Sequence, residues 1–578
     1  MRELGRSYSR RWFETLDHLR RWINAKPRLL KLIEAIILGT VLLAPSVWML
    51  SVIPPLWRDS DAYVQLTEPP GFQTIVHWGP LYSFGARIPL YVGYAIECLR
   101  AGKPFPTTAF FIHPTLNDTG VFLLLLSQHV ALVCSSFYFI VLTTRLFWVR
   151  LGLAAVWASN PLFYTFAHCV GSETLSVILL VVLGAAGLRI VQRSRNVRWK
   201  EWLFFGVLLW LSILARHINA VLAAAMPLAF LLLWGYRLIT IPLSRSQSLR
   251  RWRRLRMRQE LKHAAVAVVV GIISIVVANV SVRSLCRLAQ IPYYPPLGIT
   301  FATRLDFLAR LSPEKRDQLL DEIARNSSLM EVEKAVPLLR ESFSKEAENW
   351  DTMLPYWIEK HAEKALPLAR EAFPHQSPGD TVFLPRAASV FRGRGQSLLV
   401  VLNHTAKAFL FPPRKEYLNA VVEDFRRSLG TTIENVVNNL FLTTTFYYFR
   451  TEQLPGYASL QTYRNRSANQ IVAILKKHRY FHLWRSLDYA AFLCLWVVNL
   501  VLLAVLAQIR KKNIAVVVSY AVALTLVGLL MMLATCVLSG LQPRFTLPMW
   551  ELTILSAAVL FAKTMECLFS PGRHLPNP

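Results

Sequence analysis

Long apolar runs separated by short polar segments make up most of the chain. A helix that crosses a bilayer needs about 20 mostly apolar residues. Ten segments approach or reach that length: residues 32–53, 120–143, 146–166, 174–191, 202–215, 218–239, 264–282, 487–508, 514–535 and 548–563. The fifth and the last are short for a span. The pattern therefore predicts an all-α polytopic membrane protein with a bundle of about ten transmembrane helices.

Basic residues in the short polar segments predict the orientation, because Lys and Arg collect in cytoplasmic loops. If the N-terminus is cytoplasmic, six basic segments fall on the same side: residues 1–31, 145–150, 189–200, 237–262, 510–512 and 564–578. We therefore expect both termini in the cytoplasm. The first of these segments is a basic tail without the short apolar core or cleavage site of a secretory signal peptide. The first span is therefore expected to remain as an anchor.

Two long segments face the other side of the membrane in this topology. Residues 54–119 form the first outer loop, between the first two spans. In residues 283–486, charges, prolines and amphipathic helical patterns replace the apolar runs. We therefore expect an N-terminal transmembrane module at 32–282, an inserted helical extracytoplasmic domain at 283–486, and C-terminal transmembrane helices at 487–563.

Composition supports the membrane assignment and narrows the partners. Of 578 residues, 54% are hydrophobic and 17% are charged, whereas soluble domains carry about 25% charged residues. The 64 Lys and Arg against 35 Asp and Glu give a formal charge of +29. These basic residues lie between apolar runs and not in one patch interleaved with aromatics, which indicates membrane lipid and not nucleic acid as the partner. The seven cysteines show no CxxC and no Cys/His metal spacing, so neither zinc nor a disulfide framework is expected.

Two acids follow the first span directly. Asp59 and Asp61 begin the first outer loop, and Tyr63 follows two residues later. A carboxylate there can act as general base toward an acceptor hydroxyl or amine, or hold a divalent cation. The alternative is that both are solvated loop charges. Farther along the loop His77 stands beside Trp78, where interfacial packing is the alternative to a role in a site.

Four more ionisable residues mark the ends of spans on the same side. Glu173 opens the fourth span, where an acid that suits the helix dipole is the alternative. Arg216 and His217 split the apolar stretch 202–239, where snorkelling is the alternative. Arg544 precedes the last span and suits a phosphate at the membrane boundary, because a guanidinium matches phosphate geometry. Ionisable groups at the edge of a span are costly, so their gathering at one depth predicts a site for an anionic lipid headgroup.

Short motifs on this face follow one another in a set order. They are Asp59-Ser60-x-x-Tyr63, Arg87-x-Pro89-x-Tyr91, Asn160-Pro161-Leu162-Phe163, Ser172-Glu173-x-Leu175, Leu214-Ala215-Arg216-His217 and Arg544-Phe545-x-x-Pro548. In order and sidedness they resemble motifs of the GT-C superfamily of multi-spanning glycosyltransferases, in particular bacterial proteins similar to the protein O-mannosyltransferase and aminoarabinose transferase families. The chain departs from this pattern at His217, where many members have proline, and in its first-loop acids, which are Asp-Ser-Asp and not an Asp-Glu pair.

The resemblance implies a GT-C-like bundle that transfers a sugar from a polyprenyl-phosphate donor to a glycan, lipid or protein acceptor, on the extracytoplasmic face of a bacterial inner membrane. Asp59 would be the catalytic base, with Asp61 as the competing candidate. Arg216 and Arg544 would hold the donor phosphate, and Glu173 would orient sugar or acceptor hydroxyls. The remaining candidates for substrate binding are Tyr63, His77, Arg87 and His217. The motifs assign no metal ligands and no certain cofactor, and they leave room for a divalent cation.

Two other functions remain open. A transporter or lipid flippase typically places ionisable groups near the bilayer midplane, in interrupted helices related by an internal repeat. The charges here lie at one edge and no repeat is evident, which disfavours transport. A non-enzymatic scaffold in envelope assembly, with residues 283–486 as its docking surface, is disfavoured only weakly by the outer acids and arginines.

Overall fold

The computed structural model describes residues 27–53, 55–57, 66–67, 69–71, 73–77, 79–194, 196–240, 247–291, 293, 304–326, 336, 340, 407–408, 410–438, 440, 480, 489–510, 514–538 and 543–569. Most of the basic N-terminal tail, the residues Asp59, Asp61 and Tyr63, the C-terminal tail and much of the segment 283–486 lie outside these residues. Predictions that fall on them stay predictions.

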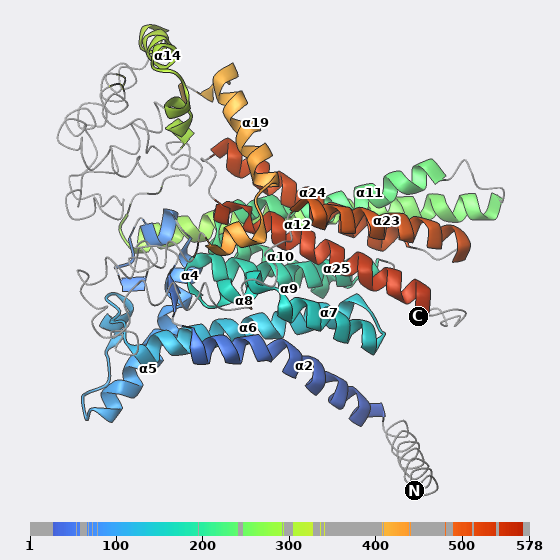
Figure 1. Ribbon diagram of the computed structural model, residues 1–578, viewed down its shortest axis with the longest axis horizontal. Coiled ribbons are helices and arrows are strands. Elements are labelled where there is room, and N and C mark those ends of the chain that lie inside the picture. The colour runs from blue at the N-terminus through green and yellow to red at the C-terminus, as the bar shows by residue number, and fades with distance from the viewer. Residues whose placement is uncertain are drawn as a thin grey trace, which may run out of the picture.

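Apolar helices lie side by side and form an elongated bundle (Figure 1). Its helices are α2 (Pro27–Val52), α6 (Asp118–Thr143), α7 (Phe147–Ser159), α8 (Pro161–Ala167), α9 (Ser172–Gln192), α10 (Trp199–Ala215), α11 (Ala225–Thr240), α12 (Gln247–Leu288), α23 (Tyr489–Arg510), α24 (Ala515–Leu538) and α25 (Leu547–Phe569). The short helix η3 (His217–Ala224) leads into α11. We call the end of the bundle where α2 and α10 end, and where α6, α9 and α25 begin, the α4 end.

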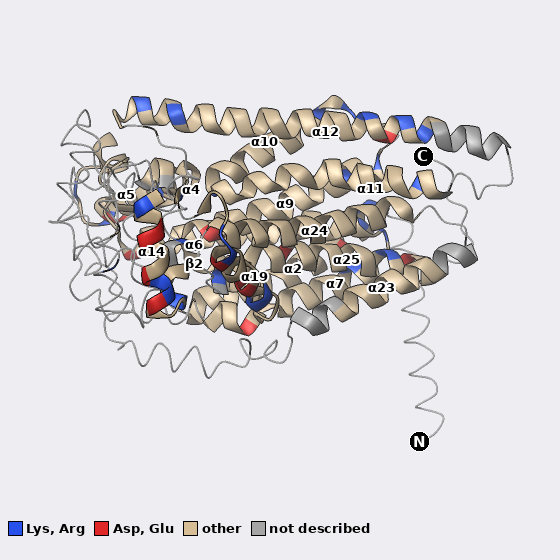
Figure 2. Ribbon diagram, turned by 90° about the horizontal axis from the view of Figure 1, so that it is seen from above, with Lys and Arg blue, Asp and Glu red and all other residues tan. Residues whose placement is uncertain are grey.

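Smaller elements lie at or beyond the α4 end. They are η1 (Gln73–His77), α4 (Pro80–Gly85), α5 (Arg87–Arg100), η2 (Thr108–Phe111), η4 (Arg304–Arg310), α14 (Pro313–Asn326), α19 (Lys415–Leu429) and η9 (Pro543–Thr546). Figure 2 shows charged residues on α14 and α19 and toward the ends of the long helices, whereas the middle of the bundle is mostly uncharged. The uncharged middle is what a bilayer interior requires.

Within the described part of the chain, seven helices are long and apolar enough to cross a membrane. They are Arg28–Val52, Asp118–Thr143, Ser172–Gln192, His217–Ile239, Leu255–Leu288, Ala515–Leu538 and Arg544–Phe569. Two further apolar helices, Phe147–Ser159 and Cys494–Val505, are shorter. This architecture is that of an all-α membrane protein, as the sequence predicts. The count of ten spans, the inserted domain and the orientation stay predictions.

The predicted span 146–166 is interrupted in the structure. α7 stops before Asn160 and α8 starts at Pro161, because proline has no N–H to continue the hydrogen-bond ladder of the preceding helix. The Asn160 side chain caps α8 by accepting the backbone N–H two residues later at 2.9 Å. Every residue from 160 to 174 is buried, although α8 is only 7 residues long. The bundle therefore holds a buried stretch of irregular backbone between α7 and α9.

Several helices are longer than the predicted spans, and α12 and α25 exceed them most. α25 has 23 residues and continues past the predicted end at 563. The polar residues there pair with each other on the helix, with Lys563 Nζ 3.0 Å from Glu566 Oε2, so they do not end it. α12 has 42 residues, which at a rise of 1.5 Å per residue is about 63 Å. It therefore extends well past both ends of the predicted span 264–282.

The sequence predicts a loop at 54–119, but much of its described part is helical. The elements η1, α4, α5 and η2 all lie in this stretch. α5 packs closely on the start of α6, because a Cβ atom added to Gly93 would lie 2.3 Å from the Cα atom of Gly120. Two glycines therefore let the described part of residues 54–119 fold onto the α4 end of the bundle.

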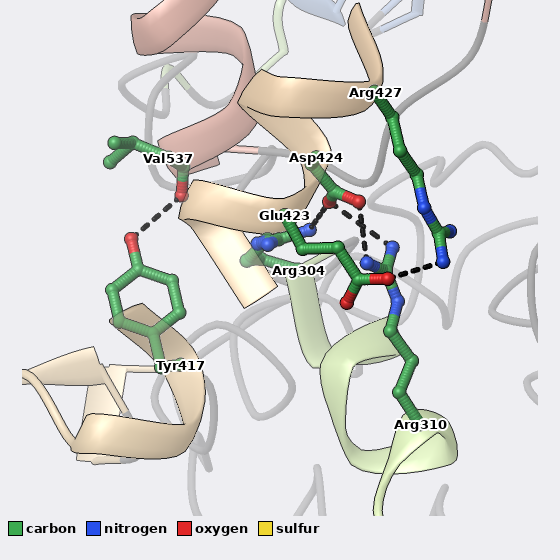
Figure 3. A network of polar contacts seen from close by, with 7 residues as sticks. All are labelled: Arg304, Arg310, Tyr417, Glu423, Asp424, Arg427 and Val537. Carbon is green, nitrogen blue, oxygen red and sulfur yellow. Dashed lines mark hydrogen bonds and ion pairs between the residues drawn. The ribbon is translucent and has the colours of Figure 1, made fainter. Parts of the chain in front are cut away.

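A buried ion-pair network joins η4 to α19 (Figure 3). The Asp424 carboxylate is 0% exposed and accepts from Arg304 Nη1 at 2.6 Å and from Arg310 Nη2 at 3.1 Å. α19 in turn contacts α24, where the Tyr417 hydroxyl donates to the Val537 carbonyl at 3.0 Å. Side chains thus fix this described part of the segment 283–486 to the bundle.

We expect the substitution Asp424→Asn to destabilise the protein strongly. It removes the carboxylate charge beside Arg304, whose side chain is 0% exposed, and breaking a buried ion pair costs about 3–5 kcal/mol. Thermal unfolding in detergent, followed by tryptophan fluorescence, should show a clearly lower midpoint for this variant.

The neighbouring residue provides a matched control. Glu423→Gln breaks an ion pair with Arg427 whose side chains are 48% and 61% exposed, and such exposed pairs contribute at most about 1 kcal/mol. Its midpoint should stay near that of the unmodified protein. Equal midpoints for Asp424→Asn and Glu423→Gln would contradict the anchoring role of Asp424.

Candidate functional site

The α4 end gathers the site candidates that the structure describes. They are Arg87 at the start of α5, Glu173 in the first turn of α9, Arg216 and His217 where α10 gives way to η3, and Arg544 in η9. Three other candidates, Asp59, Asp61 and Tyr63, lie outside the described residues, as does the side chain of His77, the last residue of η1. The assignment of all nine to a site stays a prediction.

Glu173 and Arg216 form a buried ion pair. Arg216 Nη1 lies 3.6 Å from Glu173 Oε1, and the two side chains are 20% and 1% exposed. Arg216 is the C-cap residue directly after α10, and its backbone is extended with φ −153° and ψ 127°. This break turns the guanidinium toward the first turn of α9, where the helix dipole also favours the carboxylate. Two groups that the sequence predicts at one depth are therefore in contact.

A small strand pair lies beside this ion pair. The strands β1 (Leu56–Trp57) and β2 (Cys169–Val170) pair in parallel, with Trp57 opposite the last residue of β2. In a parallel pair both chains leave at the same edge. Beyond that edge, Glu173 follows the last residue of β2 by three positions, and Asp59 follows Trp57 by two. The polypeptide that leads to Asp59, the predicted base, therefore leaves the strand pair close to the start of α9.

The irregular backbone of β2 is satisfied by side chains of α6 and α4. Gln128 Nε2 donates to the Ala167 carbonyl at 3.0 Å and to the Cys169 carbonyl at 3.1 Å. The Tyr82 hydroxyl donates to Gln128 Oε1 at 3.3 Å and accepts the Gly171 N–H at 2.9 Å. Backbone groups buried at membrane depth need such partners. The segment before Glu173 is therefore held by specific contacts on two sides.

His217 connects η3 to η1. Its Nε2 atom is 2.7 Å from the Val76 carbonyl, to which the ring donates. Close packing accompanies this contact, because a Cβ atom added to Gly79 would lie 2.4 Å from the Leu214 carbonyl oxygen. Gly79 has φ +92°, a conformation that favours glycine. The position of η1, which ends at His77, is thus fixed against the end of α10.

Arg87 makes contacts inside the first outer segment. Its side chain is 0% exposed, its Nε atom donates to the Ser83 carbonyl at 3.0 Å, and its Nη1 atom donates to the Phe111 carbonyl. Burial lowers the pKa of Arg87 to about 10, so the guanidinium stays charged at neutral pH. These contacts join α4, α5 and η2, which gives Arg87 a structural task in addition to the predicted role in substrate binding.

Arg544 lies near the level of Glu173. The helices α9 and α25 both run from the α4 end toward the end that holds the C-terminus (Figure 1), and they touch where Leu555 meets Gly184. Arg544 and Glu173 each precede that contact by eleven residues along their helices, which corresponds to about 16 Å at 1.5 Å per residue. Arg544 of η9 and Glu173 of α9 therefore lie at a similar depth along two neighbouring helices.

Several buried polar residues were not predicted as functional. Ser46, His129 and His168 form a buried hydrogen-bonded chain, and Glu551 of α25 is 0% exposed. Neither oxygen of Glu551 has a hydrogen-bond partner among the described residues. His129 and Glu551 lie inside predicted spans, so the rule that ionisable groups in spans are costly and functional could have found both. The same rule could not have found His168, because this residue lies outside the predicted spans and is buried only by the tertiary structure.

The described residues include no group of three or more His, Cys, Asp or Glu that could hold a metal ion. Asp59 and Asp61, the candidates for a divalent cation, lie outside them. Comparison with known proteins found no protein-family model that matches this chain and no curated protein that matches it.

We expect Gly79→Ala to loosen the packing of η1 and α4 on α10. A Cβ atom there meets a backbone oxygen at 2.4 Å and requires a non-glycine residue at φ +92°. The left-handed conformation alone costs about 1–2 kcal/mol, and the clash adds to it. The thermal unfolding midpoint in detergent should therefore fall.

The control is Gly85→Ala, in α4 itself. A Cβ atom at Gly85 would have nothing within 4 Å, and alanine favours a helix over glycine by about 0.5–1 kcal/mol. Its midpoint should stay the same or rise. A Gly79→Ala variant as stable as Gly85→Ala would show that the close approach of η1 to α10 is wrong.

Proposed function

We propose that the protein is an integral membrane glycosyltransferase of the GT-C type. It would move a sugar from a polyprenyl-phosphate donor to a glycan, lipid or protein acceptor at the extracytoplasmic face of a bacterial inner membrane. The observation that carries the proposal is the buried Glu173–Arg216 pair, 3.6 Å apart. It lies beside the strand pair from which the chain continues to Asp59 and Asp61.

The chemistry of a lipid-linked donor accounts for the position of these groups. A polyprenyl chain lies in the hydrocarbon layer, so its phosphate lies at the boundary where spans begin and end. Arg216 directly follows α10 and Arg544 precedes α25, so both guanidinium groups would lie at such a boundary. An arginine–phosphate contact is a charge-assisted hydrogen bond that can be bidentate. Both residues therefore suit the donor phosphate.

The acidic residues Asp59, Asp61 and Glu173 would activate the acceptor and orient the substrates. Asp59 would take the proton from the acceptor hydroxyl or amine as this group attacks the sugar, with Asp61 as the competing candidate. The polyprenyl phosphate leaves with the electrons of the sugar–phosphate bond, and the arginines stabilise the charge on it. Glu173, held by Arg216, would accept hydrogen bonds from sugar or acceptor hydroxyls.

One observation favours a second function, proton-coupled transport. Glu551 is 0% exposed and lies seven residues beyond Arg544 along the chain, so about 10 Å farther into the bundle. Its carboxyl oxygens have no hydrogen-bond partner within the described part of the chain. Acids buried inside spans are typical of proton pathways in transporters. This acid does not belong to the transferase site as proposed.

Native mass spectrometry of the detergent-purified protein should find a polyprenyl phosphate or its sugar conjugate bound. Arg544→Ala should lose most of this lipid, because the guanidinium that pairs with the phosphate is gone. Arg193→Ala is the control: Arg193 caps the other end of α9 and its side chain is 55% exposed. Absence of any polyprenyl lipid from the unmodified protein would favour transport or a scaffold.

Asp59→Asn should abolish sugar transfer and leave the unfolding midpoint unchanged. Loss of a general base lowers the rate by about 10²- to 10⁴-fold, whereas the change from carboxylate to amide preserves size and polarity. Transfer from a radiolabelled lipid-linked sugar to membrane acceptors measures the effect, with Asp61→Asn assayed in parallel. Full activity of Asp59→Asn with loss in Asp61→Asn would move the role to Asp61, and full activity in both would overturn the mechanism.

A further inference from the structure

Three buried side chains form a hydrogen-bonded chain across the bundle at its α4 end. His129 Nδ1 lies 3.0 Å from the Ser46 hydroxyl, and His129 Nε2 lies 3.0 Å from His168 Nδ1. The ring of His168 continues the chain, with Nε2 2.9 Å from the Ile53 carbonyl. All three side chains are at most 1% exposed. This series of hydrogen bonds thus starts on α2, passes through α6 and the buried stretch after α8, and returns to the end of α2.

The hydrogen bonds determine where the protons lie when both rings are neutral. A carbonyl only accepts, so His168 Nε2 carries the proton that it donates to Ile53. His168 Nδ1 is then an acceptor and takes the Nε2 proton of His129. His129 Nδ1 accepts in turn from the Ser46 hydroxyl. Every ring nitrogen is therefore used, and each ring is held in one orientation by two hydrogen bonds.

His168 binds the polypeptide segment that follows α2 at two points. Its ring binds the Ile53 carbonyl at 2.9 Å, and its own carbonyl accepts the Leu56 N–H at 3.1 Å. The strand pairing starts directly after this contact, with Leu56 opposite Cys169. One buried residue thus binds both ends of the four-residue step from Ile53 to Leu56.

This step is the last fixed part of the described chain before the acids. Trp57 is fully buried, and Asp59 follows it by two residues. The position from which the acid-bearing stretch starts is therefore set by His168, whose ring is in turn set by His129. His129 contacts that ring at Nδ1, the nitrogen that does not contact Ile53, and Ser46 in turn contacts His129.

We infer that His168 is a positioning residue, which acts through residues 53–57 to place the predicted base relative to the Glu173–Arg216 pair. This inference rests on the proposed transferase function, because the base has a task only in that reaction. The alternative is a buried histidine that only fills space. The two differ in one respect: positioning requires the hydrogen bond to Ile53, whereas filling space requires only volume.

Two substitutions of His168 separate these roles. The glutamine side chain in His168→Gln can place an amide N–H near the position of Nε2, so it can keep the hydrogen bond to Ile53. The shorter side chain in His168→Asn places its amide near the position of Nδ1, so it can keep the contact with His129 but loses Ile53. Both variants remove the aromatic ring, so a role in packing alone affects both.

The experiment compares transfer kinetics and amide hydrogen exchange for the two variants in the full-length purified protein. We expect His168→Asn to lower kcat by about 10- to 100-fold, the scale of a small misplacement of a catalytic group, with little change in KM for the lipid-linked donor. Peptides covering residues 53–57 should exchange faster, because the Ile53 carbonyl loses its contact with the His168 ring and this stretch then opens more often. His168→Gln should restore both properties toward the unmodified protein.

His263→Asn is the matched control. His263 Nε2 also donates to a backbone carbonyl, that of Ser194 at 2.8 Å, at the other end of the bundle, and its loss should change neither kcat nor exchange at 53–57. Equal effects of His168→Asn and His168→Gln, or unchanged exchange in His168→Asn, would overturn the inference. An unmodified protein that transfers no sugar would overturn the proposed function and the positioning role with it, while the exchange comparison would still decide whether His168 holds residues 53–57.

Discussion

Buried irregular backbone needs hydrogen-bond partners, and this constraint organises the α4 end of the bundle. Residues 160–174 are all buried, yet Pro161 and the short β2 prevent one continuous helix from satisfying their backbone groups. Gln128, Tyr82 and Thr174 supply the missing partners, with the Thr174 hydroxyl donating to the Cys169 carbonyl at 2.8 Å. α4, α6 and the start of α9 are therefore bound to the same stretch. The contacts that make this stretch possible are also those that fix the surroundings of Glu173.

The same constraint explains why the charged residues lie where they do. A carboxylate buried to 1% exposure needs a cation nearby, and Arg216 meets this need because α10 ends one residue before it. The helix ends thus do two things at once: they stop the spans at the boundary, and they present paired charges there. The proposed transferase would need this arrangement for the phosphate of a lipid-linked donor.

Much of the fold could be predicted from the sequence, because bilayer spans are a local property of composition. The apolar runs at 120–143 and 514–535 correspond closely to α6 and α24. The run at 146–166 is broken at Pro161, which hydropathy alone does not register. The depth shared by Glu173 and Arg216 followed from topology, but their contact did not, since it depends on how α9 and α10 pack. The pairing of β1 with β2 joins residues more than a hundred positions apart, and no local pattern encodes it.

Two buried carboxyls separate the two functions considered for this protein. Glu173 has a cationic partner and lies where α9 begins, so its charge can be kept and used at the boundary. Glu551 lies about 10 Å deeper by helix rise, and its oxygens have no hydrogen-bond partner among the described residues. A transferase at the boundary needs the first acid and not the second. The contribution of Glu551 to activity therefore distinguishes chemistry at the edge of the membrane from proton movement within it.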